Sequence, residues 1–177
     1  MSLGAADVGA LDRFDRGLLV LVAAVLLMFT NGRLDSWADA SRLATVESLV
    51  HRGTFTIDGS PYQHTGDRVE VPGRGFLSHH PPTLAMLLAG PAWLLEKGGV
   101  AFEPDGGPML WWLTILSAGL PALGGLALCL RWWRDAGVSP AQRLFWGASL
   151  GLGTLWLPYG VVLQGHLLAG FLVLVGF

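Results

Sequence analysis

The stretch that decides the fold is the polar insert Ser36–Pro82, which separates two apolar runs. It opens with SWADASRLATVE (Ser36–Glu47) and closes with GFLSHHPP (Gly75–Pro82), and GTFTID (Gly53–Asp58) and DRVEVPG (Asp67–Gly73) lie between them. A simple connector between two helices has no need of so much patterned sequence. We therefore expect the chemistry of the protein to lie in this insert.

The insert carries the signals of two helices and a hairpin. The spacing of apolar residues predicts an amphipathic helix over 36–50, with Ser36 as its N-cap. Two β-prone segments, Thr54–Ile57 and Arg68–Val71, are predicted to pair as the hairpin. The His-His-Pro-Pro turn opens a short helix over 82–96, because proline is tolerated in a first helical turn.

The composition is that of a membrane protein. Of the 177 residues, 52% are hydrophobic and 14% are charged, whereas a typical soluble domain has about 25% charged residues. No Lys, Arg, Asp or Glu falls within 17–32, 108–130 or 144–177. Long uncharged apolar runs are typical of membrane spans, since a helix satisfies its own backbone in lipid. We therefore predict an all-α polytopic membrane protein.

Charge and cysteine content exclude two other classes. The net charge is −2 and the basic residues form no cluster, which argues against nucleic acid as a partner. The single cysteine, Cys129, excludes a disulfide within the chain.

Arginines set the predicted orientation, because positive residues flank spans on the cytoplasmic side. Arg13 and Arg16 place the N-terminus in the cytoplasm, and Arg131, Arg134 and Arg143 place the later loop there too. An even number of spans must separate the two, so the short helix stays at the outer membrane surface. The predicted organisation is a cytoplasmic N-terminus (1–16), a first span (17–31), an extracytoplasmic loop (32–108), a second span (109–130), a cytoplasmic loop (131–143), a third span (144–157) and a fourth span (161–177). Since the last of these is cut short, we expect the N-terminal part of a longer multi-pass protein of the inner (plasma) membrane.

The order of motifs along the insert resembles a known family. An acidic residue follows the first span, a Gly-Thr-x-x-Ile-Asp stretch and a Ser-x-x-Pro-Pro stretch come next, and a proline-broken apolar helix ends the series. This order is similar to that of GT-C membrane glycosyltransferases, in particular bacterial members of the protein O-mannosyltransferase and aminoarabinose-transferase group. Tyr159 followed by Gly165 and His166 resembles an Asn-His pair of these proteins, with glycine in place of asparagine. The matching residues of the insert and of the apolar run that follows it are Asp39, Gly53, Thr54, Ile57, Asp58, Asp67, Val69, Gly73, Ser78, Pro81, Pro82 and Pro91.

The resemblance implies a fold, a donor and a mechanism. The fold is a multi-spanning helical bundle whose first outer loop carries interfacial helices. The donor is a sugar linked to a polyprenyl phosphate, and the acceptor is a hydroxyl of a lipid, protein or polysaccharide outside the cytoplasm. The general base is an acidic residue of the first outer loop, which by position is Asp39. The family often has lysine where this chain has His80, and histidine is a phosphate-binding cation only when protonated.

The candidate site residues keep alternative roles. A partly desolvated Asp39 can act as a general base or can simply complement the dipole of its own helix, and Asp35 is the rival carboxylate. Arg42, three residues on, either pairs with Asp39 or binds donor phosphate. The further substrate-binding candidates are His79, His80 and His166. No metal ligand is assigned and no cofactor is required, although a divalent cation between these histidines and Asp39 is left open.

Three other polar residues are predicted to lie away from the apolar core. His51 and His64 are expected to face solvent, and Glu47 to lie off the apolar face of its helix.

The alternative to an enzyme is a polytopic membrane protein without catalysis, such as a transporter. Transporters carry ionisable residues within their spans, whereas the acidic residues here lie in the insert, which favours the enzyme.

Overall fold

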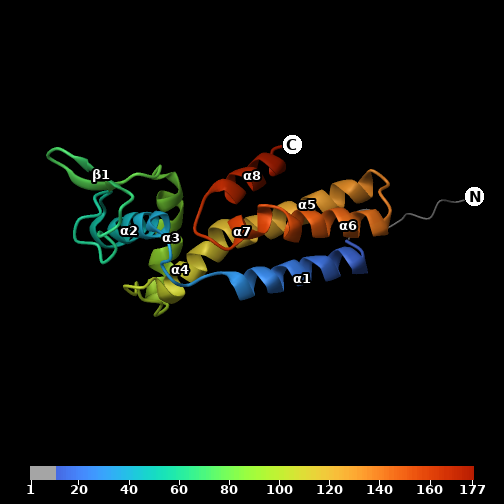
Figure 1. The fold of residues 1–177 in the computed structure, drawn as a ribbon, viewed down its shortest axis with the longest axis horizontal. Coiled ribbons are helices and arrows are strands. Elements are labelled where there is room, and N and C mark those ends of the chain that lie inside the picture. Colours follow the sequence, from blue (N-terminus) through green and yellow to red (C-terminus); the bar gives the residue numbers. More distant parts are fainter. Residues whose placement is uncertain (1–10) are drawn as a thin grey trace, which may run out of the picture.

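The computed structural model describes residues 11–177 and is mostly helical, which confirms the helical part of the predicted fold class. Figure 1 shows an elongated molecule with a long helical bundle (residues 11–29 and 115–177) and a smaller outer unit (residues 30–114) at one end. Each part has its own buried hydrophobic core. The predicted insert thus folds as a structured unit and not as an open loop.

The first helix of the bundle is α1 (Arg13–Phe29). Its N-cap is Asp12, whose side chain accepts hydrogen bonds from the backbone N–H groups of Phe14 and Asp15 at 2.8 and 2.9 Å. This cap starts the helix four residues before the predicted span 17–31, because a side-chain acceptor satisfies N–H groups that have no partner within the helix.

One continuous helix, Gly107–Asp135, links the outer unit to the bundle. It has 29 residues, and the mean hydropathy of its most apolar 18-residue window is 1.9. At 1.5 Å per residue the helix is about 43 Å long. It consists of α4 (Gly107–Thr114), a π-helical turn (Ile115–Gly119) and α5 (Leu120–Asp135). Pro121 follows the π-helical turn and has no N–H to donate.

By length and composition, this is the one helix within residues 11–177 that could cross a membrane. It extends beyond the predicted second span, 109–130, at both ends. Core helices of soluble proteins share this length and composition, so the helix does not by itself establish a polytopic membrane protein.

The last third of the chain differs from the predicted spans in its boundaries. The predicted third span, 144–157, corresponds to α6 (Pro140–Gly153), which begins early because Ser139 forms a capping box with Gln142. Residues 158–160, which separate the predicted third and fourth spans, belong to α7 (Trp156–Gly160). The predicted fourth span, 161–177, contains α8 (His166–Val175), a short apolar helix.

Glycines let α6 approach its neighbours. A Cβ atom at Gly147 would lie 2.6 Å from Leu18 Cδ2 of α1, and one at Gly151 would lie 3.1 Å from Val22 Cγ2. Both distances are shorter than ordinary van der Waals contact, so the packing of α1 against α6 depends on small residues at these positions.

The predicted cytoplasmic loop 131–143 is mostly helical. Helix α5 runs to Asp135 and α6 begins at Pro140, which leaves four residues between them. Arg143, one of the three arginines used to orient this loop, is buried in the first turn of α6. It donates hydrogen bonds to Asp15 at 3.2 Å and to Asp12 of α1. A helix that starts earlier than predicted turns this side chain toward α1.

The outer unit is built on α2 (Trp37–Arg52). The predicted N-cap is confirmed, since Ser36 Oγ accepts a hydrogen bond from the backbone N–H of Asp39 at 3.1 Å. Gly53 ends the helix in the left-handed conformation, with φ of 62°, a backbone geometry that glycine adopts without strain. The apolar side of α2 packs against α3 (Thr83–Lys97), close to the predicted 82–96.

The hairpin forms, but between different partners than predicted. Strand β1 (Arg68–Val71) pairs antiparallel with β2 (Gly75–Ser78) and not with Thr54–Ile57. The latter segment lies beside β2, where Ile57 N–H donates to the carbonyl of Phe76 at 2.8 Å. The short Pro-Gly-Arg connection favours β2, because closing a short loop costs less chain entropy than closing a long one.

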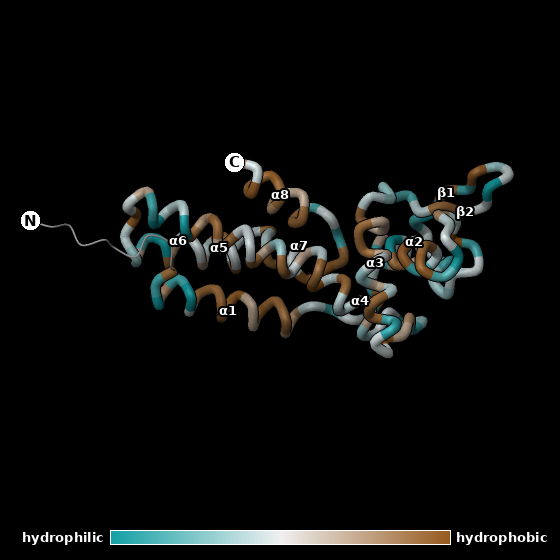
Figure 2. Tube along the Cα trace, turned by 180° about the vertical axis from the view of Figure 1, so that it is seen from behind, coloured by the Kyte–Doolittle hydropathy of each residue, from teal (hydrophilic) through white to brown (hydrophobic). Residues whose placement is uncertain are grey.

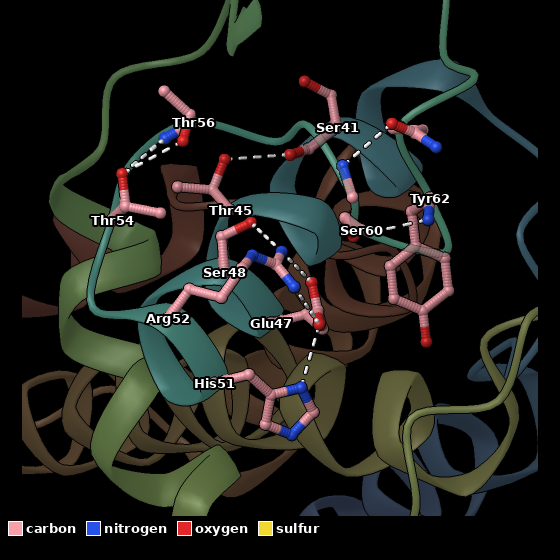
Figure 3. A network of polar contacts seen from close by, with 12 residues as sticks. Ser41, Thr45, Glu47, Ser48, His51, Arg52, Thr54, Thr56, Ser60 and Tyr62 are labelled. Carbon is pink, nitrogen blue, oxygen red and sulfur yellow. Dashed lines mark hydrogen bonds and ion pairs between the residues drawn. The ribbon is translucent and has the colours of Figure 1, made fainter. Parts of the chain in front are cut away.

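Charged residues near the C-terminal end of α2 are bound to one another. Glu47 is buried and accepts two hydrogen bonds from Arg52, at 2.9 and 2.6 Å, and one from the ring of His51 at 2.8 Å. His51 also contacts Glu96 of α3 at 2.6 Å. Figure 3 shows this Glu47 cluster together with Ser48. The cluster fastens α2 to α3. His51 is exposed as predicted, although both of its ring nitrogens have carboxylate partners, and His64 is exposed as predicted too.

Candidate functional site

The site begins with two side chains one helical turn apart on α2. Asp39 and Arg42 form an ion pair, with Asp39 Oδ1 and Arg42 Nη1 3.7 Å apart. The same Nη1 donates a hydrogen bond to the carbonyl of Leu163 at 3.0 Å. Arg42 therefore joins the outer unit to the chain segment between α7 and α8.

His80 supports Arg42 from the other side. The second terminal nitrogen of Arg42, Nη2, lies 3.3 Å from His80 Nδ1, and His80 Nε2 lies 2.8 Å from Asp67 Oδ2. A guanidinium has only donors, so Nδ1 accepts from Arg42 and Nε2 donates to Asp67. In this arrangement both ring nitrogens are occupied, and His80 positions the guanidinium.

Two serines hold Asp67 and His80 in place. Ser41 Oγ donates its proton to the backbone carbonyl of Asp67 at 2.6 Å, and it also lies 2.6 Å from Ser78 Oγ. Since the Ser41 proton is already used, Ser78 is the donor of that second contact. Ser78 in turn accepts the backbone N–H of His80 at 3.1 Å. This brace connects α2 to the hairpin and to the start of α3.

Asp39 is a largely buried carboxylate at the edge of a cavity. Its side chain is 13% exposed. Burial raises the pKa of Asp39, the Ser36 hydroxyl and the charge of Arg42 lower it, and the neighbouring Asp35 raises it further. A carboxylate with a raised pKa is a better proton acceptor when ionised, which is the property of a general base.

A polar cavity of about 340 Å³ opens beside Asp39. It is lined by Asp35 and Asp39 from one side and by the segment around Leu163 and Gln164 from the other. Asp35 also accepts a hydrogen bond from the side-chain amide of Asn31. The cavity therefore presents two carboxylates to its contents.

A second cavity, the apolar trough, runs between the start of α3 and α8 and measures about 510 Å³. Its walls are mostly aliphatic, and its polar groups include Arg42, His80 and His166. The aliphatic side chains are Leu84, Leu87, Leu168 and Leu172. Arg42 lines both the trough and the polar cavity, so its guanidinium stands where the two meet.

The structure brings most of the predicted site residues together. Asp35 and Asp39 line the polar cavity, His80 and His166 line the trough, and Arg42 lines both. His79 is the exception, because it is exposed and lines neither cavity. Its predicted contact with substrate therefore has no support in the geometry.

No cluster suits a metal ion in the part of the chain that is described. Between residues 11 and 177, no three His, Cys, Asp or Glu side chains are arranged to hold one. The arrangement joins Asp39 to His80 through a guanidinium, and a cation would be repelled there.

Sequence reasoning missed the roles of Asp67 and of the serine brace. Asp67 was noted only as a matching position of the resemblance, since nothing local indicates that a residue preceding a strand will meet His80. Its spacing from Ser78 was the available signal, because a hairpin that closes between them brings both ends together.

Comparisons with known proteins leave the chain without an identified relative, as no protein-family model, curated protein or solved structure matches it.

Proposed function

We propose that the chain belongs to a polytopic membrane glycosyltransferase of the GT-C kind. It would transfer a sugar from a polyprenyl-phosphate donor to a hydroxyl of a lipid, protein or polysaccharide acceptor on the extracytoplasmic face of the inner membrane. The observation that carries the proposal is the position of Arg42 between the carboxylate-lined cavity and the apolar trough.

This position suits the three parts of such a donor. The leucines of the trough offer an apolar surface to a polyprenyl chain. The guanidinium of Arg42 matches the geometry of a phosphate, and its charge-assisted hydrogen bonds are stronger than neutral ones. The sugar would then extend into the polar cavity beside Asp39.

The proposed reaction assigns one role to each group. The acceptor hydroxyl oxygen attacks the anomeric carbon while Asp39 removes the hydroxyl proton. The bond between the anomeric carbon and the phosphate oxygen breaks, and the polyprenyl phosphate departs with the electron pair. Arg42 stabilises the charge on the departing phosphate, and His80 keeps Arg42 in position.

Exposed apolar side chains support a membrane location for the bundle. Val20 and Met28 of α1 are 69% and 77% exposed, and Phe145 of α6 and Val173 of α8 are also exposed. Figure 2 shows the hydrophobic colouring along these helices and hydrophilic colouring concentrated at the turns and in the outer unit. Apolar surface that is this extensive marks contact with lipid or with protein.

The transfer assay that tests the proposal compares Asp39→Asn with wild type in membranes that carry the full-length protein. Labelled polyprenyl-phosphate sugars are supplied, and transferred label is measured. General-base catalysis typically contributes about 10²–10⁴-fold, so we expect Asp39→Asn to lose at least about a hundredfold in rate at normal protein level. Asp105→Asn, an exposed aspartate of the same unit, is the matched control and should transfer normally.

Two outcomes would contradict the proposal. Equal transfer by wild type and Asp39→Asn would remove Asp39 as the base and direct attention to Asp35. No transfer by either protein, across several donors, would favour a membrane protein without catalysis, such as a transporter.

A further inference from the structure

A third cavity lies on the far side of His80, between α2, β2 and the segment Gly53–Asp58. It measures about 470 Å³ and has no part in the steps described above. His80 lines both this cavity and the apolar trough, so a single side chain separates them. A ligand in the third cavity would therefore lie next to the proposed donor site without occupying it.

Hydroxyl groups with unused hydrogen-bonding capacity face this cavity. Thr54 Oγ1 and Thr56 Oγ1 lie 3.0 Å apart, and only one of them can donate to the other. Thr54 Oγ1 also accepts the backbone N–H of Thr56 at 3.2 Å. One hydroxyl proton of the pair and several lone pairs remain for a ligand, and Figure 3 shows the two threonines close together.

An aromatic ring and a positive charge complete the lining. The ring of Phe55 is 41% exposed at the cavity. Arg74, in the hairpin turn, also lines it, and within residues 11–177 no hydrogen bond or ion pair engages the Arg74 side chain. Within residues 11–177, the lining of this cavity includes no Asp or Glu, and Arg74 is its one arginine.

We propose that this cavity binds a non-reacting sugar unit of the acceptor, and that this unit carries an anionic group. The threonine hydroxyls would bond the sugar hydroxyls, Phe55 would cover the apolar face of the ring, and Arg74 would pair with the anion. The proposal rests on the proposed function, and within it selects a saccharide as the acceptor class. A phosphate and a carboxylate share the required chemistry.

The experiment measures binding and needs no transfer. The purified full-length protein is titrated in lipid nanodiscs with glucose, glucose 1-phosphate and glucuronate, and ligand-observed NMR gives the dissociation constants. We expect the two anionic sugars to bind about tenfold more tightly than glucose, as one charge-assisted hydrogen bond allows. The ratio of the dissociation constants of glucose 1-phosphate and glucuronate shows whether the site prefers a phosphate or a carboxylate.

Variants separate the two kinds of contact. Arg74→Gln should reduce the affinity for the anionic sugars to that for glucose and leave glucose itself unchanged. The double variant Thr54→Val/Thr56→Val should weaken the binding of all three sugars severalfold, since it removes two hydroxyl groups without changing the shape of the side chains. Arg131→Gln, a change at an exposed arginine near the C-terminal end of α5, should change nothing.

Three results would overturn the inference: no saturable binding of any of the sugars, equal binding of charged and neutral sugars by wild type, or unchanged binding by Arg74→Gln. Binding of inorganic phosphate as tightly as glucose 1-phosphate would also overturn it, because the site would then recognise an anion alone. Failure of the proposed function would be seen in the transfer assay, as equal transfer by wild type and Asp39→Asn. The two failures are therefore distinguishable.

Discussion

The bundle and the outer unit bury charged groups in different ways. In the bundle, Arg143 meets Asp12 and Asp15 where α6 packs on α1, and the rest of that interface is leucine, valine and glycine. In the outer unit, the 16 residues of α2 carry two charged clusters, one around Glu47 and one around Asp39. The clusters around Arg143 and Glu47 hold helices together, whereas the cluster around Asp39 faces two cavities.

The two clusters of α2 differ in how far their hydrogen bonds are satisfied. Both carboxylate oxygens of Glu47 accept short hydrogen bonds from Arg52, and His51 adds a third. Asp39 has a 3.7 Å ion pair and an open cavity beside it. A saturated cluster stabilises the fold, while an unsaturated one retains the capacity to bind a ligand. The comparison thus distinguishes the structural end of α2 from the end that we assign to function.

The largest effect is expected from Arg143→Met in the bundle. The substitution leaves Asp15, which is 2% exposed, without its cation, and removing one partner of a buried pair costs about 3–5 kcal/mol. Chemical unfolding followed by the helical circular dichroism signal should show this loss of unfolding free energy. Arg131→Met, whose exposed ion pair with Asp135 spans 3.9 Å, is the control and should cost less than about 1 kcal/mol. Equal stability of the two variants would show that the buried pair does not lock α1 to α6.

A smaller, pH-dependent effect is expected from His51→Gln in the Glu47 cluster. The hydrogen bond with Glu96 raises the pKa of His51, burial opposes this, and Glu47 raises it further. A group whose pKa is higher in the folded state stabilises the protein fully below its unfolded pKa of about 6.5, and this contribution is lost as the pH rises through the folded value. His51 is 38% exposed, so solvent screening limits the contribution to about 1 kcal/mol or less.

The measurement is the unfolding free energy of wild type and His51→Gln between pH 5.5 and 9, a range set by the unfolded pKa of histidine. Wild type should exceed the variant most at the acidic end, and the difference should shrink as the pH rises above about 6.5. His64→Gln, a change at an exposed histidine, should show no such trend. A difference that grows toward alkaline pH would contradict the assignment of a protonated His51 between Glu47 and Glu96.

Much of the fold could be predicted from local patterns. The N-cap Ser36 and the helix of α2 follow from spacing and capping chemistry, which act within a few residues. The partner of β1 could not be read in this way, because Thr54–Ile57 and Gly75–Ser78 are both β-prone and the choice between them depends on loop length. The burial of Arg143 was missed for a similar reason, since its partners lie 128 and 131 residues away.

The sequence predicted which residues form the candidate site better than it predicted the contacts between them. The spacing of Asp39 and Arg42 on one helix is a local property, and the order of motifs placed His80 and His166 in the same region. The contact of His80 with Asp67 and the contact of Arg42 with Leu163 depend on the tertiary fold. As a result, the sequence suggested a phosphate contact for His80, whereas the structure shows a histidine that supports the arginine.

The central claim is that Arg42 binds the phosphate of a polyprenyl donor where the polar cavity meets the trough. It is tested most directly by titrating a polyprenyl phosphate into nanodiscs that contain wild type, Arg42→Gln or Arg33→Gln. Arg33 lines the polar cavity but not the trough, so it is the matched control, and circular dichroism shows whether each variant is folded. We predict that Arg42→Gln weakens binding at least about tenfold, as loss of a charge-assisted hydrogen bond implies, with Arg33→Gln close to wild type. Equal affinity of folded Arg42→Gln and wild type would contradict the claim.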